Sequence, residues 1–268
     1  MEHRAAVSKA LRTRVRGGKT ICLGAFNVGD RDALPWEDWR IFPQGAVPKA
    51  PPAVGEWRVT DDHSRTGLNA ASDLTWLRHS IDSYGYLARM LTYGSVLRVS
   101  DVEGAFPLLP LAPKVWPFFL CHWPDVEAPD EAAAQWMLYV HVCGDFGAAG
   151  MPGTWHIFFE QVVLGIARSE AVLTLPLAVH VDDTGLIGPP GSEVETDAEG
   201  RRLSLWLKEE CGIYSKELKD KAAASLQLMV GFWWDSVART RTLEESKLAA
   251  YVGMLVEFSS RKSLSLRE

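Results

Sequence analysis

Cysteine is scarce in this chain, and the cysteines do not occur in pairs. Cys22, Cys121, Cys143 and Cys211 are scattered over 268 residues without a C-x-x-C motif. This spacing argues against a disulfide framework and against a cysteine zinc site. The histidines show no H-E-x-x-H or similar metal-binding spacing either. We therefore predict reduced core thiols and an intracellular protein, in the cytoplasm or the nucleus.

Long apolar runs are missing as well. Proline, lysine or histidine interrupts each apolar stretch before it reaches the length of a membrane span. The sequence therefore predicts a protein without a membrane partner. Its hydrophobic fraction of 47% and its charged fraction of 23% are ordinary for a globular chain of one or two domains.

Basic charge is in deficit. The chain has 28 lysines and arginines against 34 aspartates and glutamates, which gives a net charge of −6. This balance counts against nucleic-acid binding, because such proteins usually show a basic footprint. Acidic residues cluster in 125–131 and 193–199, however, whereas Lys49, Arg58 and Arg65 lie in one segment. A local cationic surface is therefore compatible with the acidic total.

The N-terminal segment reverses this balance. A single glutamate in the first twenty residues faces Arg4, Lys9, Arg12, Arg14, Arg16 and Lys19. We predict that residues 1–41 form a basic leader, partly disordered or helical. A mitochondrial presequence is the alternative, which the scarcity of serine disfavours.

Local patterns predict the elements of the first hundred residues. Segments 46–49 and 56–60 flank a turn rich in proline and glycine and predict a hairpin. A helix is expected from about 73 to 91, because its apolar residues recur on one face. The β-branched run 96–102 predicts a strand with Asp101 near its end.

The middle of the chain predicts a strand, a helix and a hairpin. Residues 136–142 are an apolar run consistent with a strand, and Pro152 is well placed to start a helix. An apolar strand at 171–181 is expected to return through 184–187. The two aspartates between these strands would then lie at a tight hairpin tip.

The remaining segments complete an α+β pattern. We expect surface loops at 122–134 and 188–200, a helix at 201–211, a strand at 226–235 and an amphipathic helix at 243–258. The order of strands and helices predicts a ferredoxin-like antiparallel sheet with helices on one face.

Three short motifs carry the chemistry of the chain. They are DVEGAF at 101–106, FGAAGMP at 146–152 and HVDD at 180–183. Each is weak alone, since an Asp-Asp pair is usually a solvated turn. A strand end with Asp101 and a hairpin tip with Asp182 can nevertheless supply the oxygen ligands that hard cations require, if the strands are neighbours. Asp183 is then expected to be a second or outer ligand, because adjacent residues of a strand point to opposite faces.

In this order the motifs resemble motifs A, B and C of reverse transcriptases. Residues 216–235 resemble motifs D and E, and residues 47–69 resemble the fingers segment that holds the incoming triphosphate. The ending DHS-x-x-G-x-N of that segment and the terminal LSLRE are most similar to the enzymes of retrotransposons that encode a tyrosine recombinase. The resemblance covers about residues 42–268.

This resemblance implies the core of an RNA-directed DNA polymerase in which most of the thumb is missing. Its partners would be a primed RNA or DNA template and deoxynucleoside triphosphates. The implied order is a leader at 1–41, fingers at 42–95, palm at 96–121, a fingers or hairpin insertion at 122–145, palm at 146–240 and the start of a thumb at 241–268. The oligomeric state stays open.

The resemblance also implies roles for individual residues. Asp101, Asp182 and Asp183 would hold two Mg²⁺ ions, with Mn²⁺ as a substitute, and Val102 would add a backbone carbonyl. Lys219 would give a proton to the leaving pyrophosphate, with Lys216 and Lys221 as rivals.

Further residues would contact the nucleotide. Lys49 and Arg58 would grip the triphosphate, and Gly104 and Ala105 would offer backbone N–H groups to phosphates. Phe106 would exclude a 2′-hydroxyl, and Gly147 would let the backbone approach the base pair. The alternatives are surface cations for Lys49 and Arg58 and a core phenylalanine for Phe106.

The chain also departs from the family pattern. His180 stands where an aromatic residue is usual, and the fingers hairpin contains an APPAVG insertion. A catalytically inactive palm-fold domain that binds nucleic acid or protein is therefore the alternative function. A two-metal nuclease would share the carboxylates but has no need of Phe106.

Overall fold

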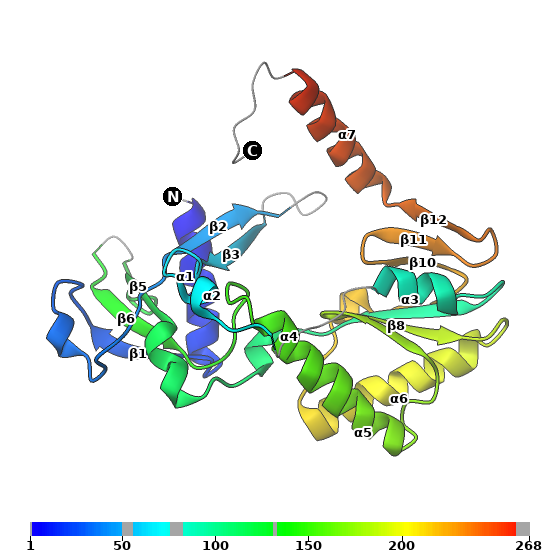
Figure 1. The fold of residues 1–268 in the computed structure, drawn as a ribbon, viewed down its shortest axis with the longest axis horizontal. Helices are drawn as coiled ribbons and strands as arrows, with labels where there is room; N and C mark the ends of the chain where they lie inside the picture. Colours follow the sequence, from blue (N-terminus) through cyan, green and yellow to red (C-terminus); the bar gives the residue numbers. More distant parts are fainter. Residues whose placement is uncertain (1, 50–55, 76–82, 131–132, 261–268) are drawn as a thin grey trace. The chain divides into compact units, whose positions relative to one another are not determined.

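The computed structural model describes residues 2–49, 56–75, 83–130 and 133–260, which form two compact units. The first unit is built from the described residues of 2–75 and 104–165, and the second from those of 83–103 and 166–260 (Figure 1). The chain passes from the second unit to the first after Glu103.

The first unit contains an antiparallel sheet, a hairpin and helix α1 (Glu2–Arg16). The sheet has the strand order β1-β6-β5, with β1 (Thr20–Ala25), β6 (Trp136–His141) and β5 (Leu120–Pro124). The hairpin joins β2 (Gln44–Pro48) to β3 (Trp57–Asp61), within two residues of the predicted strands. Short helices complete the unit: η1 (Arg31–Ala33), α2 (Leu68–Ala71), η2 (Phe106–Leu108), η3 (Pro113–Phe118), α4 (Met151–Trp155) and the π-helix η4 (His156–Val163).

Both faces of the first unit's sheet are covered. Tyr139 of β6 belongs to a buried cluster with Leu11 of α1. Its neighbours Leu138 and Val140 point to the opposite face, as adjacent strand residues must, and belong to a second cluster with Trp36. The continuous apolar run that predicted this strand is therefore explained by burial on both sides.

Helix α1 is an integral part of the first unit. Val7 and Leu11 are each 1% exposed. On its other side, Arg16 makes two hydrogen bonds of 3.1 and 2.8 Å to the Glu127 carboxylate, and Arg12 Nε donates to the Val126 carbonyl. The segment expected as a partly disordered leader thus contains this helix and strand β1, and two of its cations, Arg12 and Arg16, bond to the acidic loop after β5.

The second unit is built on a four-stranded antiparallel sheet of order β7-β8-β4-β9. The strands are β4 (Val96–Asp101), β7 (Leu177–His180), β8 (Asp183–Gly188) and β9 (Lys221–Ala224). The other elements are α3 (Ser83–Met90), α6 (Glu193–Cys211), η5 (Glu217–Lys219), β10 (Leu226–Met229), β11 (Phe232–Asp235), β12 (Thr240–Leu243) and α7 (Glu245–Ser260). Helix α5 (Leu164–Ser169) crosses the boundary between the units. The strand order is that of a β-α-β-β-α-β ferredoxin-like unit, as predicted.

Helices cover both faces of this sheet, so the prediction of helices on one face alone was wrong. Leu97 and Val99 of β4 belong to a buried cluster with Leu87 of α3. Arg98 points the other way and bonds to Asp220 at 2.7 Å, and its guanidinium lies against Gly200 of α6. The alternation along β4 therefore sends apolar side chains to α3 and a buried arginine to α6.

In two segments the secondary structure differs from the prediction: part of a predicted loop is helical, and the first part of a predicted strand is not a strand. The loop predicted at 188–200 contains the first two turns of α6, because Glu193 and Glu195 suit the positive end of the helix dipole. The strand predicted from 171 begins at Leu177 instead. The backbone N–H groups of Thr174 and Leu175 bond to the Glu199 carboxylate at 2.6 and 2.7 Å and are not available to a sheet.

The bounds of other elements also differ from the predicted ones. The strand predicted at 226–235 is a hairpin of β10 and β11, because Val230 and Gly231 both have positive φ and form a two-residue turn. The helix expected from residue 73 is observed from Ser83, and its predicted part at 76–82 lies outside the described residues. The loop predicted at 122–134 begins after Pro124, the end of β5. Within the described residues, no helix is both long and apolar enough to cross a membrane.

Candidate metal centre

Two neighbouring strands of the second unit bring the predicted aspartates together. Asp101 ends β4 and is paired in register with Asp183, the first residue of β8. His180 of β7 also pairs with Asp183, so Val181 and Asp182 form the two-residue turn of the predicted hairpin. Val181 has a φ of 58°, which is rare for a β-branched residue. The turn is fixed to β4 by a 2.7 Å hydrogen bond from Val102 N–H to the Asp182 carbonyl.

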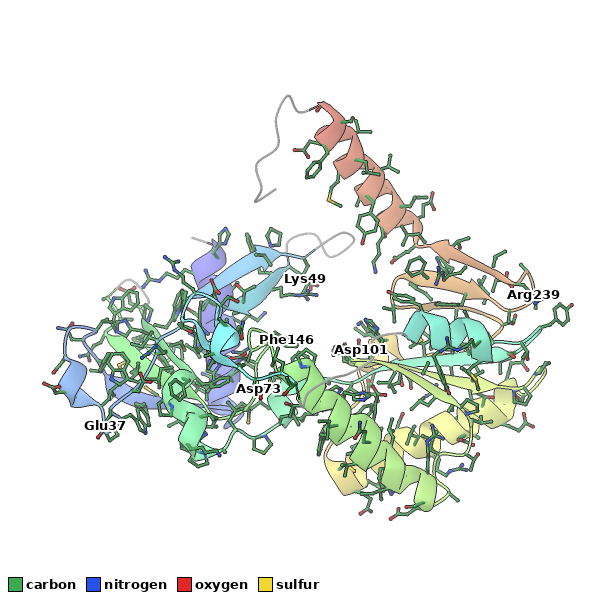
Figure 2. The ribbon with its side chains drawn as sticks, in the orientation of Figure 1. Glu37, Lys49, Asp73, Asp101, Phe146 and Arg239 are labelled. Carbon is green, nitrogen blue, oxygen red and sulfur yellow. The ribbon has the colours of Figure 1, made fainter. Side chains whose placement is uncertain are left out.

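The three carboxylates converge on one point of the second unit, where Figure 2 labels Asp101. One oxygen from each lies within 4.8 Å of the others. The Asp101 side chain is 1% exposed, whereas those of Asp182 and Asp183 are 34% and 26% exposed. The arrangement therefore has one buried carboxylate and two that solvent reaches.

Crowding changes the proton affinity of two of these groups. Burial, followed by the negative charge of Asp101, raises the pKa of Asp182. Burial, followed by the charge of Asp182, raises the pKa of Asp183 to about 7. Like charges held this close favour either a proton or a cation between them. The donor set, oxygen atoms alone, fits a hard divalent cation such as Mg²⁺ or Mn²⁺.

Two lysines neutralise Asp101. Lys216 Nζ bonds to one oxygen of Asp101 and lies 3.8 Å from Asp182, while Lys219 Nζ bonds to the other oxygen and lies 4.0 Å from Asp183. Burial would lower the pKa of Lys219, but the hydrogen bond and charge of Asp101 outweigh it and raise the pKa. Lys216 and Lys219 therefore have equal contact with Asp101, whereas Lys221 lies exposed at the start of β9.

The backbone holds these lysines in place. Lys216 N–H donates to the Asp101 carbonyl at 2.8 Å, and Glu103 N–H donates to the Tyr214 carbonyl at 2.7 Å. Val102, which is 3% exposed, lies between these two bonds opposite Ser215. The sequence predicted Lys216 only as an alternative to Lys219, because spacing along the chain does not reveal which lysine contacts Asp101 across such a bridge.

The first unit contains the other predicted residues. Phe106 is 5% exposed, and its ring centroid lies 5.0 Å from that of Phe146, which is 56% exposed (labelled in Figure 2). Ala105 is buried, and Gly104 has a φ of 61°, which favours glycine.

The predicted phosphate cations lie on the first unit's hairpin. Lys49 follows β2 and forms an exposed ion pair of 2.5 Å with Glu56, which lowers the pKa of that carboxyl. Arg58 lies on β3 opposite Val47 and is exposed. An exposed pair such as Lys49 and Glu56 is weak and is easily exchanged for another anion.

Comparisons with known proteins support the fold. No protein-family model matches the chain, and no curated protein matches its sequence. A solved structure of the foamy viral protease-reverse transcriptase in complex with double-stranded DNA matches it with a TM-score of 0.66 and 14% sequence identity. The match covers 98% of this chain and 38% of the viral one, so the chain spans well under half of that protein. At this identity the likeness shows the fold alone, and the chain has a reverse-transcriptase-like fold.

Proposed function

We propose that this chain is the polymerase core of a reverse transcriptase, which adds deoxynucleotides to a primer on an RNA or DNA template. The observation that carries the proposal is the convergence of Asp101, Asp182 and Asp183 at the ends of paired strands. The reverse-transcriptase-like fold supports it. The DHS-x-x-G-x-N pattern favours an origin in a retrotransposon that encodes a tyrosine recombinase.

In this proposal the second unit binds the metal. Asp101, Asp182 and Asp183 hold Mg²⁺, or Mn²⁺ in its place, and the Val102 carbonyl is a further ligand. When bound, two such ions neutralise the charge that develops on the phosphoryl group during its transfer. Because Asp101 is bonded to both lysines, it also fixes the ammonium groups beside the reacting phosphates.

Lys219 has the role of proton donor to the leaving pyrophosphate. Its raised pKa keeps the ammonium protonated, so that it can hydrogen-bond to the oxygen that gains negative charge as the bond to pyrophosphate breaks and can pass a proton to it. Lys216 makes the same contact with Asp101 and is the alternative donor.

The first unit contributes the groups that select the nucleotide. Lys49 and Arg58 bind the phosphates, for which Lys49 leaves its exposed pair with Glu56. The backbone N–H groups of Gly104 and Ala105 donate to phosphate oxygens, and Phe106 lies under the sugar. Gly147 lets the loop approach the new base pair.

Primer extension tests the proposed function directly. The purified chain is incubated with a labelled primer on an RNA or a DNA template, deoxynucleoside triphosphates and Mg²⁺ at low salt. We expect extension that requires the template and stops with EDTA. A folded chain that binds the primer–template without extending it, with Mg²⁺ or Mn²⁺, would favour the inactive binding module instead.

Replacement of Phe106 by alanine tests the choice of sugar. If the ring excludes a 2′-hydroxyl, Phe106→Ala should raise the use of ribonucleotides relative to deoxynucleotides by about 10- to 100-fold. The competing kcat/KM values of the two triphosphates measure this ratio.

The Phe106 experiment needs a stability control. Because the ring is buried, its removal also costs roughly 3–5 kcal/mol, so both proteins are compared well below their melting temperatures. Phe159→Ala, which removes a fully buried ring elsewhere in the same unit, should destabilise the fold without changing the ratio. Unchanged discrimination in a folded Phe106→Ala protein would make Phe106 a core residue only.

A further inference from the structure

Two segments of the first unit that are far apart in the sequence are joined by a buried hydrogen bond between side chains. His63 and Asp145 are both 0% exposed, and His63 Nε2 lies 2.7 Å from Asp145 Oδ2. The imidazole lies between the rings of Phe42 and Phe119, with centroid distances of 4.3 and 4.8 Å. These rings leave the imidazole little freedom to turn, so Asp145 meets a fixed partner.

Asp145 in turn shapes the loop that follows it. Its second oxygen accepts the backbone N–H groups of Gly147 and Ala148 at 3.0 and 3.1 Å. Burial alone would raise the pKa of this carboxyl, but hydrogen bonds with His141 and His63 outweigh burial and hold the pKa well below its usual range. A charged Asp145 therefore connects the position of His63 to the backbone of the loop.

Asn69 holds the same loop from its other end. Its side-chain oxygen accepts Ala149 N–H at 2.9 Å, and its amide nitrogen donates to the Gly147 carbonyl at 3.0 Å. Between these contacts, the Asp61 carbonyl lies so close to Gly147 that a Cβ there would be 1.6 Å from it. The segment 61–69 thus grips residues 145–149 at three places; we call these contacts the loop clamp.

An arginine lies among the acidic and histidine groups of this region. Oxygens and nitrogens of Asp61, His141 and Asp145 do lie within 4.8 Å of one another. The Arg14 guanidinium, however, lies 3.0 Å from Asp61 Oδ2 and within 3.4 Å of both ring nitrogens of His141. A cation already occupies this place, and it supports the clamp from α1.

We infer that the loop clamp positions residues 145–149 for the incoming nucleotide, with Asn69, His63 and Asp145 as positioning residues. The inference rests on the proposed function and extends it to residues that touch no substrate. The clamp fixes the backbone of Gly147 and holds Phe146 exposed beside Phe106. Loss of the clamp frees this loop, so the nucleotide must order it on binding, and affinity falls.

Asn69→Ala tests the inference with little risk to the fold, because Asn69 is only half-buried. We expect the KM for a deoxynucleoside triphosphate to rise about tenfold, which corresponds to the loss of the two hydrogen bonds that Asn69 makes with the loop. The kcat should stay within about twofold, because no catalytic group moves. Asn69→Asp keeps the oxygen that accepts Ala149 N–H and should recover part of the loss.

Ser72→Ala is the matched control. Ser72 also lies at α2, and its hydroxyl bonds to the Leu68 carbonyl rather than to the loop 145–149, so this variant loses a hydrogen bond without touching the loop. Amide hydrogen exchange of the peptide that contains 145–149 should be faster in Asn69→Ala and unchanged in Ser72→Ala. Unchanged exchange in Asn69→Ala, or faster exchange with an unchanged KM, would overturn the inference.

A separate binding experiment distinguishes failure of the loop-clamp inference from failure of the proposed function. If the wild-type chain extends no primer, calorimetric titration with dTTP and Mg²⁺ replaces the kinetic measurement. Binding that weakens about tenfold in Asn69→Ala, but not in Ser72→Ala, supports the clamp although the polymerase proposal fails. Absence of dTTP binding by the wild type, or equal binding by Asn69→Ala, overturns the inference.

Discussion

Replacement of Asp101 by asparagine is expected to reduce nucleotide addition by about 10³-fold or more, because a metal ligand and the partner of two lysines are lost together. Asparagine has the shape of aspartate but offers one neutral oxygen, which binds a hard cation weakly. Lys216 and Lys219 would also lose the charge that holds them. Primer extension measures the activity, and Mn²⁺ titration followed by electron paramagnetic resonance measures metal affinity.

The control for this variant changes charge without touching the site. Glu195→Gln removes one negative charge from an exposed position of α6 in the same unit and should leave both measurements unchanged. Circular dichroism checks that the Asp101→Asn protein is folded. If a folded Asp101→Asn protein kept its Mn²⁺ affinity and its activity, the three aspartates would not be the metal centre.

Replacement of Gly147 by alanine is expected to destabilise the first unit strongly. A Cβ would lie 1.6 Å from the Asp61 carbonyl oxygen, and that oxygen belongs to the backbone, which cannot turn aside as a side chain can. We expect a loss of more than about 3 kcal/mol, at the upper end of what overpacking costs. Thermal unfolding followed by circular dichroism and limited proteolysis of the first unit measure the loss.

Gly165→Ala provides the matched comparison. Gly165 lies in α5, and nothing is within 4 Å of the place that its Cβ would take. Alanine is the better helix former, so this variant should gain about 0.5–1 kcal/mol. A Gly147→Ala protein as stable as the wild type would show that segments 61–69 and 145–149 are not in contact.

Much of the strand framework could be predicted because it follows from short-range patterns. Branched and alternating residues located β4 and the β2–β3 hairpin, and the HVDD turn located the β7–β8 hairpin. The β10–β11 hairpin was missed because its turn is Val230-Gly231, without the Asn-Gly or Asp-Gly signal. The start of α6 was missed because its first turns are acidic and lack an apolar period.

The candidate site was predictable only in part. The order of three motifs pointed to Asp101, Asp182 and Asp183, and the structure brings them together. The contacts that support the two regions are long-range: Lys216 bonds to Asp101 across 115 residues in the second unit, and His63 bonds to Asp145 across 82 residues in the first. No local pattern marks such a partner, because burial and pairing are set by the whole fold. The roles of Lys49, Arg58, Gly104, Ala105, Phe106, Gly147 and Lys219 remain predictions for the experiments above.

The docking of α1 against the loop after β5 has a consequence for synthesis of the chain. Arg16 cannot bond to Glu127 until that residue has been synthesised, 111 residues later, and β1 cannot pair until β6 has been synthesised. At ribosomal speeds this delay is roughly 5–20 s. During that time α1 can pack on the β2–β3 hairpin but lacks Cys121 and Tyr139 of its buried cluster, and the edge of β1 that pairs with β6 is open, so the nascent chain is exposed to aggregation. We therefore expect the yield of folded protein to depend on chaperones that cover these first 25 residues.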